Sequence, residues 1–158
     1  MSLELAKAHL NKFGVEDQIL EFTVSSATVE LAAAALNCTP SMIAKTLSFI
    51  VDEKPILIVV AGDYKIDNQK FKERFNTKAK MIPADMVEEY IGHSIGGVCP
   101  FGVKDNVTTY LDESLKEHTY VYPACGSSNS AIKLTIAELE KYSMHFGWVS
   151  VTKKIEQV

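Results

Sequence analysis

Two residues whose side chains could do chemistry, His93 and Cys99, lie in one glycine-rich segment, residues 92–102. A cysteine nucleophile needs a nearby base and a lowered pKa, and His93 could supply that base. No nucleophile signature surrounds Cys99, so the thiol is better interpreted as a small group that lines a pocket. His93 is then a ligand contact, a charge at a helix C-terminus or a structural residue.

The backbone of the same segment could also do chemistry. It contains four glycines in eleven residues, and glycine both adopts φ > 0 and lets a ligand approach the main chain. Pro100 fixes its own φ and restricts the residue before it. The segment is therefore either a wide connection between strands or a shaped loop that presents backbone amides to a ligand. In the second case the backbone of Gly96 and Gly97 has the central role, and Val98 is a substrate-binding residue beside them.

Lys45 is the candidate cation. It lies between the apolar pair Ile43–Ala44 and Leu47, where a short helix is expected to pass into a strand. A lysine at such a boundary can bury its stem and aim its ammonium group into a cleft. The alternative is a surface lysine that only extends its charge into water.

A second segment, residues 123–134, gathers small and polar side chains between two expected strands. Gly126, Ser127 and Asn129 could donate several hydrogen bonds to a substrate, or could form an ordinary serine-rich turn. The chain contains no phosphate-binding GxxxxGK[ST] loop, no GxSxG nucleophile elbow and no GxGxxG. No spacing of cysteines and histidines suits a metal, so we expect neither a metal nor a cofactor.

Composition limits the class of protein. The chain has 158 residues, is 47% hydrophobic and has a formal charge of −4, which suits one domain spanning residues 1–158. Arg74 is the single arginine, so a basic face that coats long nucleic acid is not expected, although a few lysines suffice for one RNA end. Three cysteines and no apolar leader indicate the cytoplasm, and no apolar run is long enough to span a membrane.

The elements that must position these residues follow from periodicity, caps and turn residues. Helices are expected over residues 3–13, 29–36, 67–75, 83–91 and 135–142, with a short one starting at Thr39–Pro40. Strands are expected over residues 19–24, 46–51, 55–61, 78–82, 107–111, 119–122, 131–134 and 148–151. Hairpins dominate this order and strict βαβ alternation is absent, which favours an α+β or mixed α/β sheet.

Taken together, three features make the chain resemble the YbaK family of aminoacyl-tRNA deacylases, which are related to the editing domain inserted in bacterial prolyl-tRNA synthetase. The features are Lys45 at the start of a long strand, the Gly-x-x-x-Pro element at residues 96–100, and Gly126–Ser127 followed by residues 132–134. Their order and spacing cover roughly residues 28–139. The resemblance implies a mixed, partly barrel-like sheet flanked by helices.

The resemblance also implies an enzyme that hydrolyses a mischarged amino acid from tRNA in trans. Lys45 would contact the terminal adenosine and its phosphate. Residues 96–100 would hold the ester and the aminoacyl group, with His93 and Cys99 shaping the pocket, and Gly126, Ser127 and Asn129 would complete its wall. Members of the family are thought to lack a side-chain nucleophile, and the vicinal hydroxyl of the tRNA, or a thiol on the substrate, is believed to assist the attack.

Preorganised amides that stabilise an oxyanion contribute about 2.7–4 kcal/mol per donor, which fits a loop rich in glycine. The implied partners are the acceptor end of an aminoacyl-tRNA and, as a second option, an aminoacyl-tRNA synthetase. Two rivals stay open: a non-catalytic module that binds an aminoacyl-adenosine, a nucleotide or an RNA end, and a thiol enzyme that uses Cys99 with His93. The loops around His93 and at residues 125–129 depart from the commoner family sequence, so the amino acid removed is open.

Overall fold

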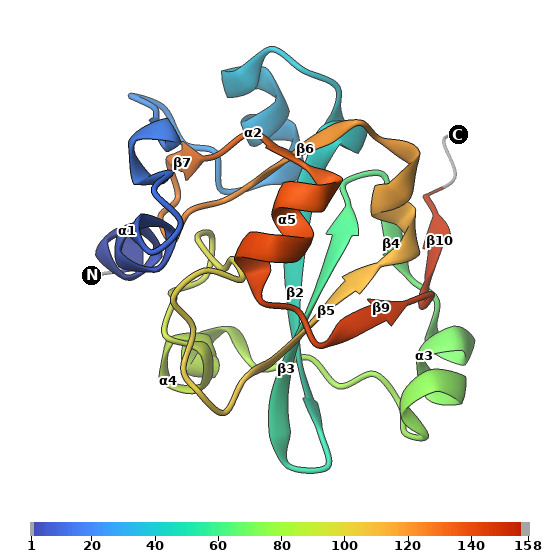
Figure 1. The fold of residues 1–158 in the computed structure, drawn as a ribbon. Coiled ribbons are helices and arrows are strands. Elements are labelled where there is room, and N and C mark those ends of the chain that lie inside the picture. Colours follow the sequence, from blue (N-terminus) through green and yellow to red (C-terminus); the bar gives the residue numbers. More distant parts are fainter. Residues whose placement is uncertain (1, 156–158) are drawn as a thin grey trace.

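The computed structural model describes residues 2–155 and is built around a mixed six-stranded sheet (Figure 1). The strand order is β8-β6-β2-β3-β5-β9. The strands are β2 (Ile43–Val51), β3 (Lys54–Ala61), β5 (Thr108–Asp112), β6 (Tyr120–Pro123), β8 (Leu134–Thr135) and β9 (Gly147–Val149). Pairs β2/β3 and β6/β8 are antiparallel, whereas β2/β6, β3/β5 and β5/β9 are parallel.

The β2–β3 hairpin forms the centre of the sheet. Its turn residues Asp52 and Glu53 both have positive φ, 51° and 66°, as the tight two-residue turn that matches strand twist requires. Nearly all of β3 is buried, because it runs between two strands with layers on both faces. This is the environment in which a continuous apolar run forms a strand without alternation.

Helices surround the sheet, and local sequence signals set their ends. They are α1 (Ser2–Asn11), α2 (Val29–Leu36), α3 (Asn68–Phe75), α4 (Val87–Ile91) and α5 (Ile136–Ser143), with 3-10 turns η1 (Glu16–Gln18), η2 (Pro40–Met42), η3 (Ala84–Met86) and η4 (Glu113–Glu117). The Thr28 hydroxyl accepts the Leu31 N–H at the start of α2, and Thr135 forms a reciprocal capping box with Glu138. No helix within residues 2–155 is both long and apolar enough to cross a membrane.

The largest apolar cluster places the glycine-rich segment inside the molecule. Helix α1 buries Ala6 and Leu10 in the same cluster as Cys99 and Phe101. A separate cluster lies under α3, where Phe71 packs against Phe49 of β2 with ring centroids 5.0 Å apart. The sheet is therefore covered on different sides by residues from the beginning and the middle of the chain.

The predicted fold class is confirmed: the sheet is mixed and partly closed, and helices flank it. The expectation that hairpins dominate is wrong, since three of the five strand pairs in the main sheet are parallel. Parallel neighbours come from distant parts of the chain, and their pairing leaves no turn signal in the sequence.

Several predicted strands are shorter than expected. Of residues 19–24 only β1 (Leu20–Glu21) is a strand, because Phe22 and Ser26 donate instead to carbonyls of the 128–129 loop. Residues 78–82 form one isolated bridge, between Met81 and Phe49. The segment 131–134 is divided between β7 (Ser130–Ala131) and β8, and β1 pairs with β7.

One ladder was not predicted. The strand expected at residues 148–151 ends at Val149, and the chain then forms β10 (Thr152–Lys154), which pairs with β4 (Tyr64–Ile66). Each of these strands has three residues, too few for a period to be read from the sequence. This ladder lies beyond β9 and next to α3.

Candidate functional site

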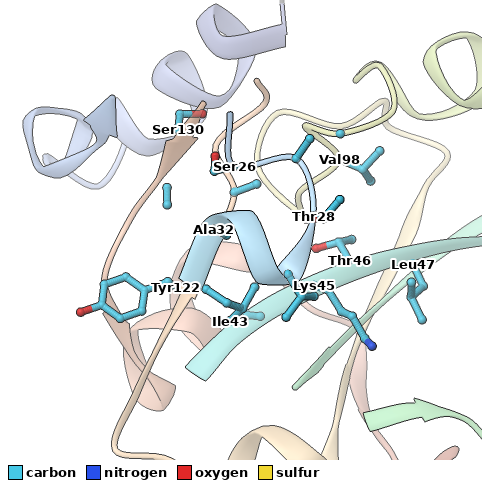
Figure 2. Close-up of a pocket in the computed structure, with 16 residues that line it drawn as sticks. Ser26, Thr28, Ala32, Ile43, Lys45, Thr46, Leu47, Val98, Tyr122 and Ser130 are labelled. Carbon is cyan, nitrogen blue, oxygen red and sulfur yellow. The ribbon is translucent and has the colours of Figure 1, made fainter. Parts of the chain in front are cut away.

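A cavity of about 280 Å³ opens between the start of α2 and the first half of β2. Figure 2 shows Ser26, Thr28 and Val98 on one side of it and Ile43 and Tyr122 on the other. The lining residues are Ser26, Ala27, Thr28, Val29, Ala32, Ile43, Ala44, Lys45, Thr46, Leu47, Gly96, Val98, Tyr122, Ala124, Ser130 and Ala131. The lining is mostly apolar with a few polar groups, which is the usual composition of a small-molecule site.

Lys45 is the cation of this cavity. It lies in β2 opposite Val60 of β3, and its Nζ donates to the carbonyl of Gly62 at 3.4 Å. Partial burial lowers the pKa of Lys45, while the nearby carboxylates of Asp63 and Glu30 oppose that shift. The ammonium group is held by one neutral acceptor, so it keeps donors for an anionic ligand.

Thr46 adds an unused polar atom. Its Oγ1 is buried, and no protein group in residues 2–155 hydrogen-bonds to it. A buried hydroxyl without a partner costs about 1–3 kcal/mol, and because Thr46 lines the cavity, rotation of its side chain would let a water or a ligand there complete it. Thr46 was not among the residues predicted for the site.

The glycine-rich loop contributes Gly96 and Val98 to the lining. Gly96 has φ +92°, a conformation that a side chain would strain. Within the described part of the chain the N–H groups of Gly96 and Val98 have no hydrogen-bond acceptor. Both residues line the cavity, and each therefore has an unused backbone donor.

Gly97 has a different position from its neighbours. Its N–H donates to the Ser94 carbonyl at 3.1 Å, and it does not line the cavity. A Cβ on Gly97 would lie 2.6 Å from the Gly126 carbon and the Ser127 nitrogen. Glycine is required here because the two predicted loops touch backbone to backbone, and their contact forms a wall of the site.

Gly126, Ser127 and Asn129 do not line the cavity themselves. Gly126 and Ser127 line a second, more open depression beside α1. The Ser127 hydroxyl donates to Asn129 Oδ1 at 2.9 Å, and its oxygen lies 2.6 Å from the Ser130 hydroxyl, which can donate to it. The Asn129 amide donates to the Phe22 carbonyl at 2.9 Å, so both side chains hold the loop in shape.

His93 and Cys99 are fully buried, each with 0% exposure, and neither lines the cavity. His93 Nε2 donates to the Phe101 carbonyl at 2.6 Å, so the nitrogen 3.5 Å from Cys99 Sγ carries a proton and cannot act as a base toward it. Burial also raises the pKa of Cys99 to about 12. The placement of these two side chains at the pocket surface is corrected: they support the loop from behind.

Pro100 also points away from the cavity, into a shallow depression that includes Lys12 and Met144. In residues 2–155 no three His, Cys, Asp or Glu side chains are grouped so that they could hold a metal ion. Of the predicted site residues, Lys45, Gly96 and Val98 meet in one cavity.

The largest omission from the predicted site is the segment 26–29 before and within α2. In this segment Thr28 both caps α2 and lines the cavity. Tyr122 is a further addition, and burial raises the pKa of its phenol. A signal was present for Thr28, since a capped helix start next to a ligand loop is a common place for donors.

Comparison with known proteins gives one consistent group of relatives. Residues 23–142 match the sequence model of the family described as "Aminoacyl-tRNA editing domain". "Uncharacterized protein YwhH" of Bacillus subtilis (strain 168) is 48% identical over 157 residues, which are 99% of this chain and all of that protein. A proline–tRNA ligase of Geobacillus sp. (strain WCH70) is 28% identical over 107 residues, 67% of this chain but 18% of the ligase.

Solved structures give the same architecture. A crystal structure described as "a putative trans-editing enzyme for prolyl tRNA synthetase" superposes with a TM-score of 0.85 at 25% identity, over 96% of this chain and 97% of that one. The hypothetical protein APE2540 superposes with a TM-score of 0.79 at 23% identity, over 92% of this chain and 99% of that one.

Proposed function

The chain belongs to the aminoacyl-tRNA editing domain family, and on that premise we propose that it is a deacylase that acts in trans on mischarged tRNA. The observation that carries the proposal is the cavity lined by Lys45, Gly96 and Val98, in which the two loop residues have backbone N–H groups without an acceptor in the described part of the chain. We take residues 1–158 as one editing domain that works in the cytoplasm, where tRNAs are charged.

Each group in the cavity has a part in this proposal. The apolar lining holds the side chain of the misattached amino acid. Lys45 attracts a phosphate of the terminal nucleotide. The N–H groups of Gly96 and Val98 donate to the carbonyl oxygen as it becomes an oxyanion, and such donors contribute about 2.7–4 kcal/mol each in measured enzymes. Thr46 Oγ1 completes its hydrogen bonding on the substrate or on the attacking water.

The chemical step is an ester hydrolysis. The oxygen of a water molecule bonds to the carbonyl carbon, the bond from that carbon to the ribose oxygen breaks, and the ribose oxygen takes up a proton. The products are the free amino acid and the deacylated tRNA. The vicinal ribose hydroxyl orients the water, so the enzyme needs no side-chain nucleophile, in accordance with the buried thiol of Cys99.

One observation favours a second candidate, a module that binds the aminoacylated end without hydrolysing it. The cavity lining contains no His, Cys, Asp or Glu side chain in the part of the chain described here. A site that lacks a general base can bind the aminoacylated end without hydrolysing it. The two candidates differ in turnover and not in the ligand.

The test is a deacylation panel. Purified protein is incubated with tRNAs mischarged with small and medium-sized amino acids, and ester loss is compared with the uncatalysed rate. The proposal predicts acceleration with at least one substrate and loss of it in Lys45→Met, whereas Lys141→Met, at an exposed helix position, behaves as wild type. Saturable binding without acceleration would instead support the binding module.

A further inference from the structure

Positive charge is concentrated in two short segments of an acidic chain. Residues 63–80 and 153–154 hold eight of the 16 Lys and Arg residues but only three of the 20 Asp and Glu residues. These segments therefore carry a formal charge of +5 in a chain of −4. They comprise β4, α3 and β10 together with residues 76–80, which follow α3.

The fold brings these segments together into one surface. Strand β10 pairs with β4, and Lys70 of α3 donates its Nζ to the Thr152 carbonyl of β10 at 2.9 Å. Figure 1 shows β10 at one edge of the molecule with α3 next to it. We call this surface the α3–β10 face; its cations are Lys65, Lys70, Arg74, Lys153 and Lys154, all exposed.

Lys65 and Lys153 stand directly opposite each other in the ladder. Side chains in that position project from the same face about 4.5–5.5 Å apart, and like charges there are destabilising. Within residues 2–155 neither lysine forms an ion pair, although the carboxylate of Asp67, which caps α3, also attracts Lys153. One nearby carboxylate does not balance two lysines placed side by side, whereas an anionic partner does.

The face continues to the cavity. Lys45 bonds the carbonyl of Gly62, and the next residue, Asp63, pairs with Lys154 at 3.8 Å before the chain enters β4. The cavity cation is therefore joined to the β4–β10 ladder through the Asp63–Lys154 ion pair, and the cations Lys65 and Lys153 lie beyond that pair. A ligand whose charged end lies at Lys45 would meet this face with its remaining length.

Arg74 lies at the far end of the face and is held in place. Its guanidinium stacks 5.0 Å from the ring centre of Phe75 and 5.5 Å from that of Tyr110. A guanidinium fixed on aromatic rings loses little freedom when its fork binds a phosphate. This suits a rigid, repeating anion better than a flexible acidic peptide.

We propose that the α3–β10 face binds the phosphate backbone of the tRNA stem whose acceptor end enters the cavity. The proposal rests on the proposed function, because it assigns the body of the same substrate. A tRNA stem is a stiff polyanion that is recognised through its phosphates and shape, and a protein surface offers no comparable row of negative charges. The face then supplies affinity, and the cavity supplies selection of the amino acid.

The experiment measures binding of uncharged tRNA, which does not depend on hydrolysis. The probe is a labelled total tRNA preparation titrated at about 50 mM and about 200 mM salt. The test variant is Lys65→Gln with Lys153→Gln, and the matched control is Lys12→Gln with Lys141→Gln, two exposed lysines outside the face that change the net charge equally. A further variant, Lys153→Glu, places a carboxylate opposite Lys65.

Wild-type affinity for tRNA should fall steeply as salt rises. Loss of two phosphate contacts should make the slope of log K against log salt less negative by about 1.8, so the fold-loss of affinity between the two salt concentrations should be about 12 times smaller than in wild type. The control pair should leave the slope unchanged. Lys153→Glu should weaken tRNA binding while raising the melting temperature, because it relieves the opposed charges. Equal slopes for the test and control pairs, or no tRNA binding by wild type, would overturn the proposal. The lysines would then be charges that prevent the exposed strand edge from pairing with another chain.

Failure of the proposed function would look different. If the deacylation panel shows no turnover but the two pairs differ in tRNA binding, the face is established and the hydrolysis is not. If hydrolysis is observed and the two pairs do not differ in tRNA binding, the hydrolysis is established and the tRNA-binding face is not.

Discussion

The substitution Thr46→Val tests the site because it should change stability and activity in opposite directions. Thr46 Oγ1 is buried and has no partner within residues 2–155, although the residue lines the cavity. Valine keeps the branched shape at Cβ and removes the hydroxyl, so the change leaves the packing of β2 nearly intact.

The magnitude follows from that missing partner. A buried unpaired hydroxyl costs about 1–3 kcal/mol, so its removal should stabilise the free protein by about 1 kcal/mol. For a chain of this size about 1 kcal/mol corresponds to about 2–4 °C in melting temperature. If the hydroxyl bonds substrate or water during the reaction, its loss removes about 0.5–1.5 kcal/mol, a fall of about two- to twelvefold in kcat/KM.

The assay pairs thermal unfolding with deacylation kinetics and uses Thr152→Val as the control. Thr152 is also buried in a strand, but its Oγ1 donates to Asp112 Oδ2 at 2.6 Å. The control should therefore lose about 1.5–3 kcal/mol, because it breaks a hydrogen bond to a charged group. If Thr46→Val is destabilised to the same extent, or if it keeps full kcat/KM, the assignment of Thr46 to the substrate is refuted.

Four further predictions address the wall, the buried groups and the cation. Gly97→Ala should lose about 1–3 kcal/mol of stability, because its Cβ would lie 2.6 Å from the backbone of Gly126 and Ser127. Gly147→Ala is the control, since its Cβ would have open space and it should unfold like wild type. Equal melting temperatures for the two variants would contradict the contact between the loops. Burial lowers the pKa of His93 from 6.5, so the unfolded chain binds more protons below that pH. Stability measured by thermal melts should therefore fall as the pH drops through 6.5 and be regained above it, and His93→Gln should flatten this profile. Cys99, whose pKa burial raises to about 12, should resist iodoacetamide in the folded protein; rapid alkylation together with loss of activity would revive the thiol mechanism. Because burial lowers the pKa of Lys45, KM for aminoacyl-tRNA should begin to rise with pH earlier than a free lysine would allow, and Lys45→Arg should remove this dependence.

The features that the sequence predicted correctly depend on local signals. Helices were expected at residues 29–36 and 135–142, and both begin there because Thr28 and Thr135 accept hydrogen bonds from backbone N–H groups three residues on. The position of Lys45 beside a ligand loop followed from its place between apolar neighbours and from the family resemblance. Gly96 and Val98 lie in the cavity because the glycines let the loop turn its backbone inward.

The features that the sequence could not show depend on contacts between distant residues. His93 and Cys99 are buried because α1 packs over the loop, with the Gly102 N–H donating to His9 Nδ1 across 93 positions. Nothing in the sequence of residues 92–102 alone indicates that α1 packs over this loop. The β4–β10 ladder joins strands of three residues that lie far apart in the sequence, so the basic face forms only once they pair.

The most direct test of the central claim is single-turnover deacylation of a mischarged tRNA by wild type, Lys45→Met and Cys99→Ser. If the cavity hydrolyses the ester through Lys45 and the amides of Gly96 and Val98, wild type exceeds the uncatalysed rate, Cys99→Ser retains that rate, and Lys45→Met loses most of it. If wild type accelerates no substrate of the panel, or if Lys45→Met remains as fast as wild type, the cavity is not the editing site.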